Sequence, residues 1–317
     1  MTPMHMIAQF AATGLMAGLM LTILLAAVAS PLIAVVSQRL AVRRSKVFYD
    51  KCARQIATMG TMVGGVLFAS AAAGTAHLAI QHPDLFEGPF RLPVFICVGA
   101  LALGMVLSTA YTLSWTPLRG NKSLHSLLGG FASVAMLAAL FLFLGLAAAM
   151  LKPGHHVAPQ ATTAELLLAV YTAIPDARFW FFLAQCVVGG LGAAGMFAQA
   201  YLLMRRNQDD FGRDYYKFAL PYCVRWSIAP LLLQLIPASW LAFLLLRPHA
   251  AATPLADPAI WLWGAAAVLP ITASLLWLRV MCSETPLRHK ASIVLAIPLV
   301  LVAAAAQATA MLHHMAR

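Results

Sequence analysis

Histidine is the residue type whose number and placement in this chain could support chemistry. The 317 residues include ten histidines, and a neutral imidazole is a good ligand for haem iron and for copper. A haem held between helices needs two axial ligands from facing helices, commonly histidine or methionine. The candidate ligands are His5, His77, His125, His249, His313 and His314. The alternative interpretation is that these are ordinary histidines of loops and membrane interfaces.

Three arginines could accompany such a haem. Arg91, Arg178 and Arg247 are predicted at the same side of the membrane as most of the histidines, where a guanidinium can pair with a haem propionate. Copper is the other metal considered, with His5 and His77 as its ligands. Methionines flank His5 at positions 4 and 6, and the combination suits a soft metal ion. We expect haem b or quinone ahead of copper.

Several other chemistries lack their residues. All ten acidic residues fall in loops or at predicted helix ends, so no intramembrane carboxylate is available to couple transport to an ion. None of the five cysteines forms a CxxC pair, which gives no indication of a zinc site or covalently attached haem. Motifs of ATPases and membrane proteases are absent. A transport path would have only Gln185, Gln234 and Gln307 as obvious polar lining.

The elements that position these residues are membrane helices. Hydrophobic residues make up 62% of the chain and charged residues 10%, whereas soluble domains carry about 25% charged residues. A span needs about 20 apolar residues, and inside lipid its backbone must bond internally as a helix. The sequence predicts eight spans, at 8–36, 56–79, 93–115, 125–151, 179–203, 226–246, 259–281 and 291–313.

Lysine and arginine predict the orientation of these spans. Sixteen of the 21 basic residues fall in the loops after the first, third, fifth and seventh spans, which places those loops in the cytoplasm. Both termini are then outside, and the expected location is a bacterial inner membrane. Because topology explains most of the net charge of +11, the chain is not predicted to bind nucleic acid.

The two halves of the chain resemble each other. A Thr-Pro-Leu-Arg segment begins at Thr116 and again at Thr285, and Cys-x-Arg begins at Cys52 and again at Cys223. These pairs are 169 and 171 residues apart, and an even number of spans per unit gives a parallel repeat. We predict one four-helix unit at 1–152, a second at 179–317, and an outer loop at 153–178 with a short surface helix.

The layout resembles that of cytochrome bd-type quinol oxidase subunits. The likeness rests on the two four-helix units, the outside N-terminus and His5 just before the first span. The long outer loop that this family carries between its sixth and seventh helices is absent, since the corresponding link at 247–258 is short. No residue role is transferred from the family.

We therefore predict a membrane subunit of a respiratory or other redox complex. It would bind b-type haem, quinone or both near the periplasmic face, in contact with lipid and with periplasmic redox subunits or other membrane subunits. Whether it is itself part of an oxidoreductase is left open. The first alternative is a transporter of a small solute or metal ion, and the second is a membrane anchor without a cofactor.

Overall fold

The protein is described from a computed structural model that covers residues 3–81, 91–150, 162, 164–165, 168, 172, 174, 176–208, 211–246 and 257–315. Within these ranges the regular structure is helical and no strand occurs. The helices are α1 (Pro3–Arg44), α2 (Val47–Gln81), α4 (Arg91–Leu113), α5 (Lys122–Met150), α7 (Ala177–Arg205), α8 (Arg213–Leu233), α9 (Leu235–Leu246), α10 (Pro258–Met281), the 3-10 helix η3 (Pro286–His289) and α11 (Lys290–Met315).

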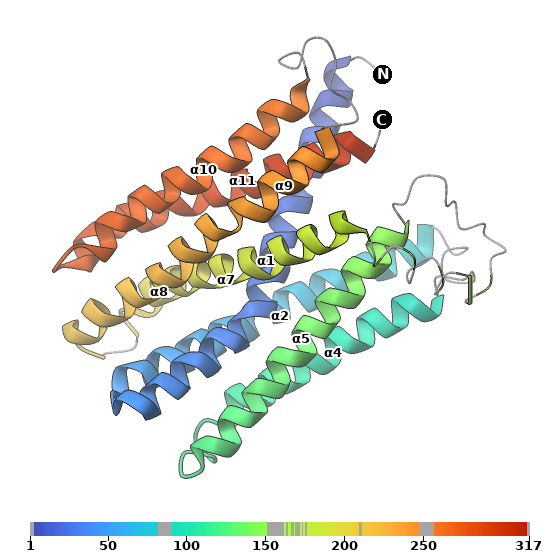
Figure 1. Ribbon diagram of the computed structural model, residues 1–317. Helices are drawn as coiled ribbons and strands as arrows, with labels where there is room; N and C mark the ends of the chain where they lie inside the picture. The colour runs from blue at the N-terminus through green and yellow to red at the C-terminus, as the bar shows by residue number, and fades with distance from the viewer. Residues whose placement is uncertain are drawn as a thin grey trace.

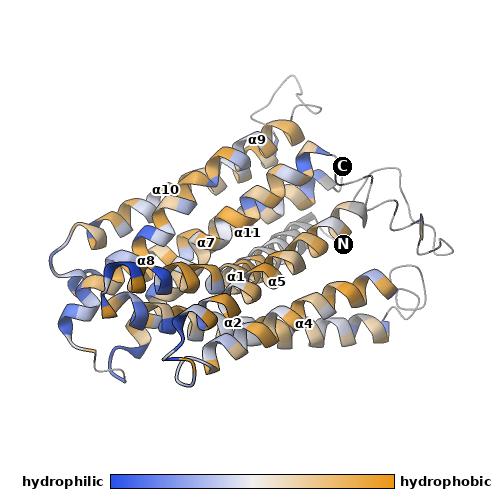
Figure 2. Cartoon of the chain, turned by 60° about the horizontal axis from the view of Figure 1, so that its bottom comes forward, coloured by the Kyte–Doolittle hydropathy of each residue, from blue (hydrophilic) through white to orange (hydrophobic). Residues whose placement is uncertain are grey.

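Eight segments of this described chain are long and apolar enough to cross a membrane, with α8 and α9 together forming one of them. The predicted fold class, an all-helical multi-pass membrane protein with eight spans, is confirmed. The N- and C-terminal ends lie at the same end of the bundle (Figure 1). Most hydrophilic residues gather at the opposite end (Figure 2), as expected for loops that carry the topology-determining charges.

α1 occupies the centre of the bundle and contacts α2, α5, α7 and α11 (Figure 1). Its approach to α11 depends on residues without large side chains. A Cβ atom added to Gly18 would lie 2.6 Å from the Cα of Ala305, and one added to Gly60 of α2 would meet Ser30 of α1. Helices in lipid associate largely through such close packing, so these glycines let α1 approach α11 and α2 closely.

The helices extend beyond the predicted apolar spans at the hydrophilic end. The first span was expected to end at 36 and the second to begin at 56, yet α1 continues to Arg44 and α2 begins at Val47. Ser45, with φ of 51°, makes the turn between them. The prediction was wrong here because hydropathy locates the lipid boundary, while lysine, arginine and glutamine are good helix formers in water.

Two predicted equivalents of the repeat meet in the core. The Sγ atoms of Cys52 in α2 and Cys223 in α8 lie 3.9 Å apart, and both side chains are fully buried. Equivalent positions of two units can touch only near the axis that relates them. The repeat of two four-helix units itself stays a prediction.

A closed ring of hydrogen bonds joins α1, α4 and α5. The Nε2 of His125 donates to the carbonyl of Tyr111 at 2.9 Å, which leaves Nδ1 to accept from the Gln38 amide at 2.7 Å. The Tyr111 hydroxyl donates to Oε1 of Gln38 at 3.0 Å. All three side chains are buried. Because buried polar groups are costly unless paired, the ring specifies how these three helices fit together.

We predict that Gln38→Leu lowers the melting temperature by about 5 °C. The change leaves the Tyr111 hydroxyl and the Nδ1 of His125 unpaired in the core, and each such group costs about 1–3 kcal/mol. Gln208→Leu is the matched control because Gln208 is exposed. Thermal unfolding in detergent, followed by circular dichroism, measures both. Equal melting temperatures for the two variants would show that the ring adds no stability.

Candidate functional site

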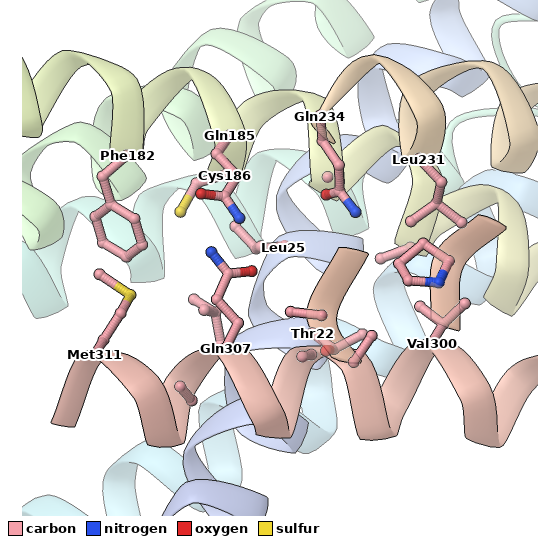
Figure 3. Close-up of a pocket in the computed structure, with 18 residues that line it drawn as sticks. Thr22, Leu25, Phe182, Gln185, Cys186, Leu231, Gln234, Val300, Gln307 and Met311 are labelled. Carbon is pink, nitrogen blue, oxygen red and sulfur yellow. The ribbon is translucent and has the colours of Figure 1, made fainter. Parts of the chain in front are cut away.

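A small cavity lies inside the membrane-spanning region, between α1 and the helices of the second half. Its volume is about 70 Å³. Three glutamines line it, Gln185 from α7, Gln234 from the junction of α8 and α9, and Gln307 from α11. Figure 3 shows the amides of Gln185 and Gln307 pointing toward one another across the cavity, with Gln234 entering beside them. These are the three glutamines that the sequence offered as the polar lining of a transport path.

A break in the sixth span places Gln234 at this cavity. α8 ends at Leu233 and α9 begins at Leu235, with prolines at 230 and 237 on either side. Pro237 has no N–H, so it cannot donate to the carbonyl of Leu233 and the helix is interrupted. The Oε1 of Gln234 occupies the space that a side chain at Gly189 would fill. Glycine at 189 therefore lets the amide approach α7.

The cavity presents hydrogen-bonding groups without charge. Gln185 is 6% exposed, and its Oε1 has no hydrogen-bond partner among the described residues. Pro270 of α10 also lines the cavity and cannot donate to the carbonyl of Ala266, another lining residue. Thr22 and Cys186 complete the polar lining, and among the described residues no Asp, Glu, Lys or Arg contributes to it. The site can accept and donate hydrogen bonds but cannot exchange protons through a titrating carboxylate or amine.

Further buried polar atoms without a described partner lie on α7 and α10, outside the glutamine cavity. Gln199 Oε1, Ser274 Oγ and Trp277 Nε1 are buried without a partner in the described structure. Gln199 lies 14 residues after Gln185 on nearly the same face of α7, and its amide donates to Ser227 at 2.7 Å. Sequence reasoning did not single out these residues. The sequence did contain a signal for two of them. Ser274 and Trp277 follow Pro270 by four and seven residues, a spacing that places all three on one face of a helix.

Among the residues that the structure describes, the predicted histidines do not gather into a metal-binding group. His77 is exposed on α2, and both ring nitrogens of His125 are engaged in the ring with Gln38 and Tyr111. The Nε2 of His313 lies 3.8 Å from Oδ1 of Asp257, and His314 is next to it at the end of α11. The side chain of His5 and the whole of His249 lie outside the described residues.

The two described candidates for propionate partners, Arg91 and Arg178, are both exposed. Arg178 makes a salt bridge with Asp176 at 2.8 Å, and both are at the surface. Arg91 is exposed at the start of α4, and Arg247 lies outside the described residues. Among the residues with described positions, no three His, Cys, Asp or Glu side chains gather as metal ligands would. The haem and copper ligand sets remain predictions.

A second cavity of about 690 Å³ opens at the hydrophilic end, between the α7–α8 link and η3. Four basic side chains and two acidic ones line it, namely Arg206, Arg213, Lys217, Arg288, Asp214 and Glu284. This excess of positive charge is typical of loops that face the cytoplasm.

Comparison of the sequence with models of protein families and with curated proteins finds no match.

The fold is similar to a chain in the structure of bd oxidase from Geobacillus thermodenitrificans. The likeness covers 96% of this chain and 87% of that chain, with a TM-score of 0.69 and 14% sequence identity. At this identity the comparison shows a shared fold. The helical arrangement of nearly the whole chain is therefore one that a chain of this bd oxidase also has.

Proposed function

We propose that this chain is a membrane subunit of a respiratory or related redox complex. The observation that carries the proposal is the likeness over 96% of the chain to a chain of bd oxidase. A likeness over 96% of the chain extends far beyond any short shared motif. The described residues agree with a membrane subunit, because eight of their segments are long and apolar enough to cross a membrane.

A redox group on this chain would fit best at the outer end of α11. Asp257 caps α10 by accepting from the N–H of Ala259, and its carboxylate also faces the Nε2 of His313. A carboxylate that orients an imidazole is a common second-shell arrangement around a metal. His125 does not fit, since both of its nitrogens already have partners.

The cavity beside His313 and the glutamine cavity are both too small to enclose a haem or a quinone, so such a group would need a second subunit to cover it. The cavity beside His313 and His314 is about 10 Å³, far too small to enclose a haem. The glutamine cavity of about 70 Å³ is smaller than the 150 Å³ or so that holds a benzene ring, so a quinone ring does not fit there either. We infer that a haem or quinone bound at this end would be covered in part by a partner subunit, with His313 contributing from this chain.

We predict that the tagged chain, extracted gently from its host membranes, copurifies with another membrane subunit and a b-type spectrum. Reduced-minus-oxidised spectra and metal analysis of the purified complex are the measurements. His313→Ala should lower haem per complex at least about threefold, because one axial ligand or its support is lost. His289→Ala, at the opposite end of α11, is the control.

Other results would separate the alternatives. A colourless complex with a copurifying subunit would favour an anchor without a cofactor over a haem protein. A chain that purifies alone, without haem, quinone or copper, would contradict membership in a redox complex. Haem retained at full occupancy in His313→Ala would place the ligands elsewhere while leaving the redox proposal intact.

Transport of a small solute is the second candidate function. It is favoured by the polar cavity that Gln185, Gln234 and Gln307 line inside the spans. Broken helices with prolines are also how several transporters expose polar groups within the membrane. The break at Gln234 lies at this cavity. The absence of a charged residue from the lining points to an uncharged cargo.

We predict that liposomes containing the protein are more permeable to acetamide than liposomes without it. Gln185→Leu should lower the added permeability by about threefold, since one buried hydrogen-bonding group is worth about 0.5–1.5 kcal/mol. The exposed control Gln208→Leu should behave as the wild type. Stopped-flow light scattering measures the rates. Permeability equal to that of protein-free liposomes would rule out transport of this solute class.

A further inference from the structure

A buried polar atom in the glutamine cavity lacks a hydrogen-bond partner among the described residues. The Oε1 of Gln185 is buried and unpartnered among the described residues, and Figure 3 shows its amide directed into the cavity. Buried polar atoms in proteins are nearly always paired, with protein or with an ordered small molecule. The amides of Gln234 and Gln307 reach the same space from two other helices. The arrangement therefore suits a molecule that several amides contact together.

Size restricts the occupant. A cavity of about 70 Å³ has roughly half the volume of an engineered cavity that takes benzene, whose ring has six carbon atoms. By that proportion the cavity holds roughly three non-hydrogen atoms, close to the four of acetamide or urea, or about two waters. The apolar neighbours Phe182, Leu231 and Met311 close the remaining walls. A ring-sized ligand would have to displace one of them.

The uncharged lining further restricts the ligand to a neutral molecule. No acidic or basic side chain lines the cavity, and an ion inside a membrane span is costly unless an opposite charge compensates it. Carboxamides, by contrast, both donate and accept hydrogen bonds. A neutral ligand that also donates and accepts can satisfy them, and a carboxamide or urea group has this pattern in a planar shape.

We propose that the cavity among Gln185, Gln234 and Gln307 binds a small neutral solute of the carboxamide or urea class. The proposal deepens the transport function and rests on it for a biological role. The binding itself is measured without any flux, so the two can fail separately. It is independent of the redox proposal, whose candidate residues lie at the end of α11.

A native cysteine offers a direct test. Cys186 lines the cavity and is 2% exposed, whereas Cys97 on α4 is half-buried and does not line it. The wild-type protein is treated with neutral chloroacetamide or with chloroacetate, an anion with the same number of non-hydrogen atoms; either reagent alkylates the thiol and releases chloride. Peptide mass spectrometry then gives the labelling rate of each cysteine in the same sample. Cys97 reports any effect of reagent partitioning into lipid or detergent.

Relative to their rates at Cys97, we expect the neutral reagent to label Cys186 at least about tenfold faster than the anionic reagent of the same size, because a charge is excluded from the cavity. Acetamide at about 0.5 M should slow the neutral labelling of Cys186 at least about twofold through occupancy of the site. It should leave Cys97 unchanged. Acetate, which has the shape of acetamide but carries a charge, is the matched solute control and should not protect Cys186.

Each other outcome would overturn the proposal. Failure of the neutral reagent to label Cys186, while Cys97 is labelled, would show a closed cavity. Equal protection by acetate and acetamide would contradict selection of neutral solutes. Protection by neither would contradict a solute site. Gln185→Leu should abolish protection by acetamide, and protection that persists in this folded variant would remove the glutamine from the site. Should the variant not fold, the wild-type comparison of the two solutes still decides.

Discussion

Inside lipid, every polar group of the protein must find its partner within the protein, and this constraint explains most of the structure. It requires helices for the backbone, because a helix pairs its own N–H and carbonyl groups. It also confines Asp, Glu, Lys and Arg to the ends of the spans. What remains for chemistry within the membrane is the set of uncharged polar side chains, chiefly glutamine, serine, threonine and tyrosine, together with His125.

The same constraint gives α1 its central role. Four helices pack on it, and in lipid this packing comes from close contact of small residues and from hydrogen bonds between helices. Gly18 permits the approach of α11, while Gln38 binds α4 and α5 through the ring with Tyr111 and His125. One helix thereby joins the two halves, and it also forms one wall of the glutamine cavity through Thr22.

The sequence predicted the number and kind of spans because hydropathy measures what lipid tolerates. It located helix ends poorly, since α1 and α2 continue into water. The three glutamines of the cavity could be predicted because so few polar residues occur within spans. The partners of His125 could not, since Gln38 and Tyr111 are distant in sequence and their meeting depends on how α1, α4 and α5 pack. A histidine chosen as a candidate ligand thus has both of its nitrogens in a structural ring.

The two halves satisfy their buried polar groups differently. Around α1, α2, α4 and α5 the amides close on partners, as Gln38 does with Tyr111 and His125, and as Gln55 does by accepting from Tyr215. In α7 and α10 the buried atoms Gln185 Oε1, Gln199 Oε1 and Ser274 Oγ have none within the described chain. Unpaired groups of this kind cost stability unless something else pairs with them. If the halves arose as a repeat, one half has used its polar residues to fix helix packing. In the other half, Gln185 lines the glutamine cavity with its Oε1 unpaired among the described residues, which is the arrangement expected where a ligand supplies the missing partner.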